Sequence, residues 1–189
     1  MLPPIGAESS RKGWGVNRAV LLLLLTLSGL GQLDYGRKVA WNLPDEARKR
    51  LEKVKFFDYY ELSDAVNPFY LRADFDGDGK PDYAILVVGK NTDNRVIAIC
   101  RSGSPNVEIL TDMEKSVVFD PKRPAGSVAN FNWMDAWQIV RRRKLGASEL
   151  NEKTPPPMVG EGILVEKTES ASAIIYWTGT RYYRYQTSD

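Results

Sequence analysis

The chain has 189 residues, enough for one domain with a hydrophobic core, and a formal net charge of +2. It contains no histidine and one cysteine, which excludes histidine-ligated metals, catalysis by a histidine base and an intramolecular disulfide framework. Without residues 1–31, which carry three basic residues and one acidic residue, the charges balance. This balance argues against a nucleic-acid partner, because phosphate binding requires excess positive charge.

The amino-terminal segment has the pattern of a secretory signal peptide. Basic residues within 11–18 precede an apolar run at 19–27, and small residues occupy 28–31. The run is shorter than the roughly 20 residues that span a bilayer, and no cysteine follows it to carry a lipoprotein anchor. We predict a signal peptide at residues 1–31, a mature chain beginning near Gln32 and a secreted or periplasmic location. The alternative is an uncleaved signal anchor.

Residues 44–55 predict one helix, because a proline opens the segment and two acidic residues occupy its first turn. Ala47, Leu51 and Val54 recur at intervals of four and three residues and form a narrow apolar stripe. The aromatic segment 56–60 follows directly. We expect it to pack this covering helix onto a sheet.

A strand predicted at 68–73 leads into a nine-residue acidic loop, residues 74–82. Four carboxylates this close repel one another unless a cation lies among them, and they belong to Asp74, Asp76, Asp78 and Asp82. The loop glycines permit positive φ, and the carbonyl of Lys80 can face the same centre while its ammonium stays in water. These hard oxygen ligands suit Ca²⁺ better than Mg²⁺, which keeps more of its waters.

The spacing of the loop distinguishes it from an EF-hand, which has a glutamate at the twelfth position, where this chain has Ile85. Asp-x-Asp-x-Asp-Gly-x-x-Asp followed by an apolar strand resembles the calcium loop of FG-GAP/VCBS-type repeats, found in integrin α-subunit propellers and secreted bacterial proteins. The resemblance covers residues 68–88 and implies a lone repeat unit that binds Ca²⁺. The implied ligands are Asp74, Asp76, Asp78, Lys80 (through its carbonyl) and Asp82.

The alternative interpretation of the acidic loop is a solvated turn between two strands, because aspartate and glycine favour turns. Four aspartates at this spacing exceed what a turn requires, and we therefore favour calcium.

The apolar run at 83–88 predicts a central strand, and Cys100 is expected in the core. Further strands are predicted at 95–101 and 107–110, and residues 136–140 form either a strand, which we favour, or a short helix. The basic cluster at 141–144 either forms a solvated strand end, which we favour, or contacts an anionic glycan or lipid headgroup. Residues 151–160 contain three consecutive prolines and predict an exposed, stiff loop.

The carboxyl-terminal region predicts strands at 162–167 and 173–177 and a hairpin that returns at 180–186. A two-residue turn would place Trp177 opposite Thr180 and, further along, Ile175 opposite Tyr182. The aromatic density here could form a sugar-stacking platform. A packed hairpin is the interpretation we favour, because tyrosine and tryptophan are common in strands.

The sequence therefore predicts a β-rich α+β fold with a mostly antiparallel sheet, one covering helix and a calcium-binding turn, all within residues 32–189. The predicted function is an extracytoplasmic calcium-binding domain with a structural Ca²⁺ that binds a protein or an envelope polymer such as a glycan. The alternatives are a periplasmic inhibitor and, less favoured, a hydrolase using carboxylates such as Asp58, Glu61 or Asp64. Nothing in the spacing of those carboxylates points to catalysis.

Overall fold

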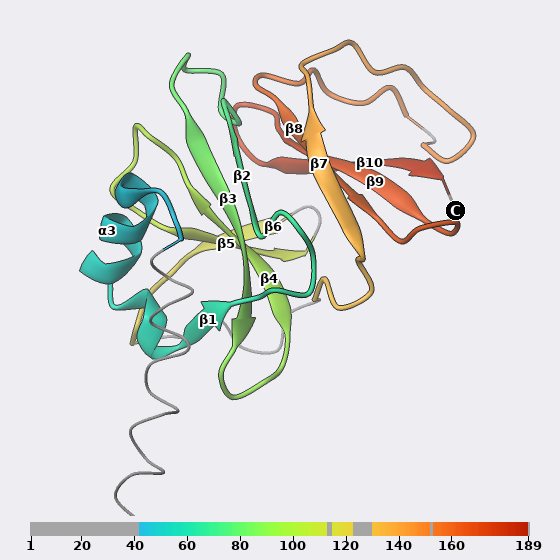
Figure 1. Ribbon diagram of the computed structural model, residues 1–189. Coiled ribbons are helices and arrows are strands. Elements are labelled where there is room, and N and C mark those ends of the chain that lie inside the picture. The colour runs from blue at the N-terminus through green and yellow to red at the C-terminus, as the bar shows by residue number, and fades with distance from the viewer. Residues whose placement is uncertain (1–41, 113–114, 123–129, 152, 189) are drawn as a thin grey trace, which may run out of the picture. The chain divides into compact units, whose positions relative to one another are not determined.

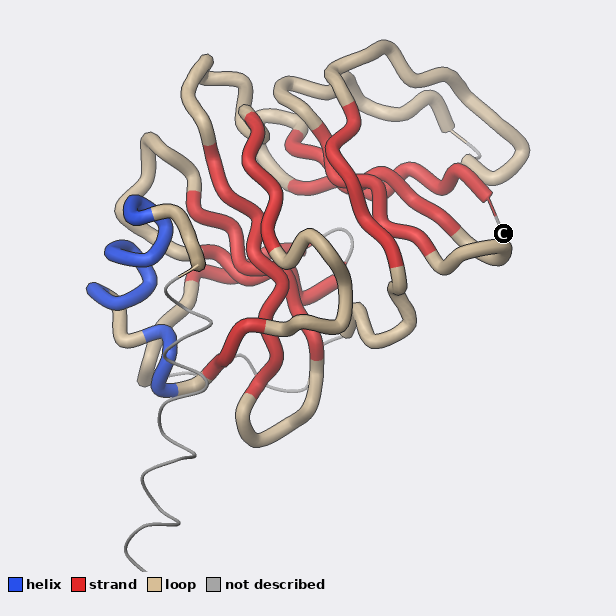
Figure 2. Tube along the Cα trace, in the orientation of Figure 1, coloured by secondary structure: helices blue, strands red, loops and turns tan. Residues whose placement is uncertain are grey.

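The computed structural model describes residues 42–188 except 113–114, 123–129 and 152, and all of these lie within one unit, Gly36–Asp189. Figure 1 shows a helix beside the first of two antiparallel β-sheets, and Figure 2 shows how strands and loops alternate along the described chain. The predicted β-rich α+β class is confirmed. The predicted signal peptide lies outside the described residues.

The covering helix forms where the sequence predicted it. Helix α3 spans Asp45–Lys53 and buries Ala47 and Leu51, and the short 3₁₀ helix η1 spans Phe56–Asp58. Phe56 is fully buried and stacks on Tyr60 with ring centroids 4.8 Å apart. The aromatic segment therefore packs the helix onto the first sheet, as expected.

The first sheet has six strands, and β3 lies at its centre, hydrogen-bonded to β1, β2 and β4. Its strands are β1 Tyr60–Leu62, β2 Tyr70–Ala73, β3 Asp82–Gly89, β4 Arg95–Cys100, β5 Glu108–Asp112 and β6 Lys115–Val118. Along β3, Ala84 and Leu86 face one hydrophobic core, whereas Tyr83, Ile85 and Val87 face the core beneath the helix. This two-sided burial explains the uninterrupted apolar run.

The second sheet is a four-stranded antiparallel meander in the order β10-β9-β8-β7. Its strands are β7 Ala136–Val140, β8 Gly162–Glu166, β9 Ser172–Trp177 and β10 Tyr182–Ser188. The two sheets share one core, to which Leu86 and Ile97 contribute from the first sheet and Ile163, Val165 and Ile175 from the second. The predicted strands are thus divided between two sheets, and β1 and β6 are strands that the sequence analysis did not predict.

The register predicted for the last hairpin is wrong by two residues. Tyr182 pairs with Trp177, because the turn takes four residues, 178–181, rather than two. Thr178 closes this turn by exchanging backbone and hydroxyl hydrogen bonds with Arg181, and Gly179 adopts φ +98°. A shift of two residues keeps every side chain on its predicted face.

The proline-rich segment at residues 151–160 is only partly exposed, so the prediction of an exposed loop is wrong for its buried positions. Pro155, Met158 and Gly160 are buried. The backbone N–H of Val159 donates to the carbonyl of Trp177, so the end of this segment runs along the second sheet. It also reaches the acidic loop of the first sheet.

Candidate metal site

The acidic loop, residues 74–82, closes the hairpin of β2 and β3, whose last pair is Ala73 and Asp82. Gly77 and Gly79 adopt φ of +79° and +82°, a left-handed conformation that glycine tolerates far better than other residues. A Cβ on Gly77 would also lie 2.6 Å from the carbonyl oxygen of Val159. The tight curl of the loop and its contact with residue 159 both depend on glycine.

The loop brings together three of its four carboxylates. One oxygen from each of Asp74, Asp76 and Asp78 lies within 4.8 Å of the other two. The backbone N–H groups of both loop glycines donate to Asp74, at 2.7 and 2.9 Å. Asp76 accepts from the N–H of Asp78 at 3.2 Å, and Asp78 accepts from that of Lys80 at 2.8 Å. These bonds orient the carboxylates and leave lone pairs on their oxygens for a cation.

Asp82 lies outside this cluster of three and has 0% of its surface exposed. One of its oxygens accepts hydrogen bonds from the N–H groups of Phe75 and Asp76, at 3.0 and 3.3 Å. The other accepts from the N–H of Ser102 at 2.6 Å. Asp82 therefore ties the loop to the turn after β4, and its coordination of an ion remains a prediction.

The carboxylates of the loop could together hold a metal ion. Burial raises the pKa of Asp82 to about 6 and the negative charge of Asp76 adds to this, while the N–H groups bonded to Asp82 oppose it. Three further carboxylates with hard oxygen donors are the chemistry that Ca²⁺ prefers. The Lys80 side chain is exposed, in keeping with a role limited to its carbonyl, which remains a prediction.

Sequence reasoning missed three residues that hold the loop in place. The hydroxyl of Ser102 donates to Asp78 at 3.3 Å. Glu161 accepts from the N–H of Asp74 through its carboxylate at 3.1 Å and donates its own N–H to the Asp74 carbonyl at 2.7 Å. Gly160 packs directly on the backbone of Asp74 and Phe75. The Gly-Glu-Gly sequence at 160–162 is the signal that could have suggested a close backbone approach.

The carboxylates considered for a hydrolase form no comparable arrangement. Asp58, Glu61 and Asp64 are all exposed. Among the described residues, they are not brought together in the way that the three loop aspartates are. The structure therefore adds nothing in favour of catalysis by these side chains.

The anchoring role of Asp82 can be tested with Asp82→Asn. The asparagine side chain has an NH₂ group in place of one carboxylate oxygen. This donor would face the backbone N–H of either Ser102 or Phe75, so one hydrogen bond would be lost. We expect the variant to lose about 1–3 kcal/mol of unfolding free energy in chelator, as for a buried unsatisfied donor. Urea unfolding measures this loss. Asp64→Asn, at an exposed site, is the control, and equal stability of the two variants would contradict the anchoring role.

Within residues 42–188, apart from the gaps in the description, no helix is long and apolar enough to cross a membrane. Comparisons with protein-family models, curated proteins and solved structures found no match to this chain.

Proposed function

We propose that this chain is an extracytoplasmic domain, similar to one FG-GAP/VCBS-type unit, in which a single Ca²⁺ binds the acidic loop and has a structural role. The observation that carries the proposal is the cluster of Asp74, Asp76 and Asp78, whose oxygens lie within 4.8 Å of one another. Backbone N–H groups already hold these carboxylates in place, so little ordering is required when an ion binds.

The contacts of the loop support a structural role for the ion. The loop connects neighbouring strands of the first sheet and is hydrogen-bonded through Asp74 to Glu161, the residue just before β8 of the second sheet. Repulsion among the clustered carboxylates loosens this junction when no cation is present. A bound Ca²⁺ removes the repulsion and thereby stabilises the contact between the loop and residues 159–161.

The proposed role of the stabilised domain is to bind a protein or an envelope polymer outside the cytoplasm. The expected signal peptide supports this location, where calcium is abundant. The absence of histidine and the exposure of the candidate catalytic carboxylates favour binding over hydrolysis.

Thermal melts of the full chain in calcium and in chelator test the proposal. At free calcium 100 times the dissociation constant, the ion adds about 2.7 kcal/mol, which raises the melting temperature by roughly 5–10 °C for a domain of this size. Asp76→Ala and Asp78→Ala should each lose most of this shift, because each removes a proposed ligand.

Two matched variants separate ligation from general effects on charge and fold. Asp64→Ala removes an exposed carboxylate away from the loop and should keep the whole shift. Lys80→Ala should also keep it, because only the carbonyl of that residue is proposed to coordinate. Equal melting of the wild type in calcium and in chelator would leave the acidic loop as an ordinary turn.

A further inference from the structure

Two runs of three or more consecutive basic residues occur in the described part of the chain, and their backbones differ. Residues 48–50 lie within helix α3, where the Arg48 side chain forms ion pairs with Asp45 and Glu52 at 2.9 and 3.0 Å. Residues 141–144 follow directly after β7, and all four of their side chains are exposed. Similar sequences are therefore held in a helix at one site and presented on a loop at the other.

The segment that carries the second run has a free backbone. We call residues 141–147 the basic loop, and Figure 1 shows this part of the chain leaving the end of β7. It has no helix, strand or turn, and its backbone forms no hydrogen bond with any other described residue. The basic loop can therefore take up an extended conformation without breaking an existing backbone hydrogen bond.

Paired basic side chains on a free backbone are what an endoprotease specific for basic residues requires. Such an enzyme binds its substrate as an extended chain, with backbone hydrogen bonds like those of an added strand. The basic side chain before the cut enters a pocket that contains a carboxylate. Exposed loops are accordingly the preferred sites of cleavage, whereas residues 48–50 cannot be bound in this way unless helix α3 opens.

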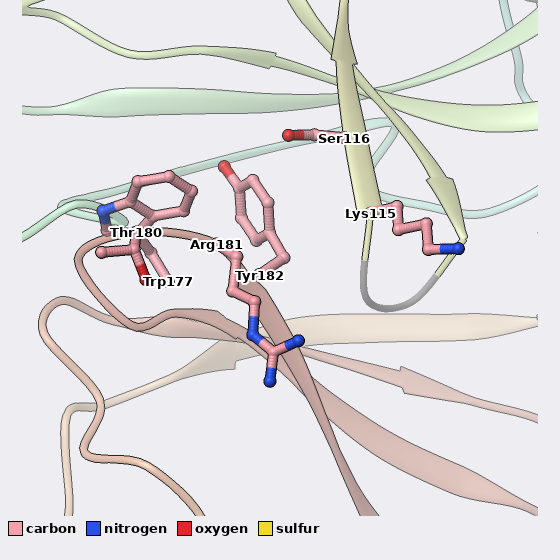
Figure 3. Close-up of a pocket in the computed structure, with 6 residues that line it drawn as sticks. All are labelled: Lys115, Ser116, Trp177, Thr180, Arg181 and Tyr182. Atoms are coloured by element: carbon pink, nitrogen blue, oxygen red, sulfur yellow. The ribbon is translucent and has the colours of Figure 1, made fainter.

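Exposure of a single basic side chain is not enough, as Arg181 illustrates. This residue is exposed, but its turn is closed by backbone and hydroxyl hydrogen bonds with Thr178. Figure 3 shows the Arg181 side chain pointing away from Lys115, the other cation drawn there. Among the described residues, the basic loop thus combines consecutive basic side chains with an unpaired backbone in a way that helix α3 and this turn do not.

The strands on either side of the basic loop hold together independently of it. Strand β7 pairs with β8 along its whole length. Trp137 of β7 is 5% exposed and lies in the core shared by the two sheets, to which Ile163 and Val165 of β8 also contribute. A cut within the basic loop breaks none of these contacts, so the two resulting fragments remain one folded particle.

We propose that the basic loop is a processing site for an endoprotease that cuts after paired basic residues. Hydrolysis breaks the C–N bond between Arg143 and Lys144. Water supplies a hydroxyl group to the carbonyl carbon of Arg143 and a proton to the nitrogen of Lys144, so that a new carboxylate and a new amino group form. The product is a two-chain domain made of residues 1–143 and 144–189.

The cut also changes the face of the second sheet that lies opposite the shared core. On that face Leu145 packs against a buried cluster of Met158, Ile174 and Tyr176. After the cut Leu145 lies next to a free chain end, so processing loosens its cover over this cluster. The inference goes beyond the proposed function and does not depend on the calcium site.

Timed digestion of the full chain with a purified subtilisin-type protease specific for paired basic residues, followed by intact-mass measurement, tests the inference. The cut within residues 141–144 should be at least about tenfold faster than any cut within residues 48–50, because the helix must open first. The two fragments should elute together from a size-exclusion column and separate only in denaturant. Trypsin, which needs one basic residue, should cut residues 141–144 at least about tenfold faster than Arg181.

Arg142→Gln combined with Arg143→Gln leaves no basic pair in the basic loop and should slow the cut by the first protease at least about tenfold. Both positions are exposed, so the variant should melt like the wild type. Lys49→Gln combined with Lys53→Gln is the matched control. It removes two exposed charges from helix α3 and should change the rate at the basic loop less than about twofold.

Four results would overturn the inference, each on its own. They are equal rates at the two basic runs, equal trypsin rates at Arg181 and the basic loop, an unchanged rate in the variant without a basic pair, and fragments that separate without denaturant. The calcium-dependent melting shift should be the same in both charge variants as in the wild type. Either proposal can therefore fail without the other.

Discussion

Tyr182→Ala should lower the free energy of unfolding by about 3–5 kcal/mol, the range for truncating a large buried aromatic side chain. Tyr182 is 2% exposed and belongs to the core shared by the two sheets, where its ring meets that of Trp177. Its removal opens a cavity between the sheets that the close-packed strands cannot fill. Urea unfolding followed by tryptophan fluorescence measures the loss.

The size of this effect distinguishes a core position from a surface platform. Trp177 is only half-buried, so Trp177→Ala should cost clearly less than Tyr182→Ala. Unchanged stability of Tyr182→Ala would show that the hairpin does not contribute to the core and would leave it a role in recognition alone.

Gly160→Ala should lower the free energy of unfolding by about 3 kcal/mol, at the upper end of the range for atoms inserted into a packed site. A Cβ at this position would overlap the carbonyl oxygen of Asp74 and would lie 2.5 Å from that of Phe75. Both are backbone atoms, so relief requires the acidic loop and the second sheet to separate. The 2.7 Å bond from the Glu161 N–H to Asp74 should break as a result.

Gly146→Ala is the matched control for this substitution. No atom lies within 4 Å of the position that a Cβ on Gly146 would take, and the residue has no positive φ, so alanine there should be neutral or slightly stabilising. Thermal melts of both variants in chelator give the comparison without any contribution from an ion. Equal melting temperatures would show that the acidic loop does not rest on residue 160.

The strands β2, β3 and β4 of the first sheet were predictable because their apolar side chains follow a local pattern. In β4, Ile97 and Ile99 face the core shared with the second sheet, and Val96, Ala98 and Cys100 face the helix side, as the period of two predicted. Burial also makes Cys100 a core residue, and it raises the pKa of its thiol to about 12. Local pattern was sufficient here because both faces of the strand are covered.

The division into two sheets and the strand β6 could not be predicted in the same way. Alternation reveals that a strand is buried, but it does not reveal which sheet the strand joins. Strand β6 exposes both Val117 and Val118, so it lacks the alternation that identifies a half-buried strand. The register of the last hairpin depends on a four-residue turn in which Thr178 hydrogen-bonds to Arg181. Because threonine can adopt many other conformations, its presence in the sequence did not reveal the length of this turn.

The candidate site was only partly predictable for a related reason. The convergence of Asp74, Asp76 and Asp78 is local, and their spacing predicted it. The contacts of Asp82 with Ser102 and of Asp74 with Glu161 join residues far apart in the sequence, and no short motif records them. Ligation by Asp82 was predicted from its position in the motif and stays a prediction, whereas the hydrogen bonds by which it anchors the loop could not be read from the motif.

Calorimetric titration of the full chain with Ca²⁺ tests the central proposal most directly, because it measures ligation without relying on stability. The proposal predicts one Ca²⁺ bound per chain by the wild type and little or no binding by Asp78→Ala, with Asp64→Ala binding like the wild type. A wild-type chain that shows no heat of binding and no calcium-dependent melting shift would contradict the calcium site, and the resemblance of its loop to FG-GAP/VCBS-type repeats would then have no functional meaning.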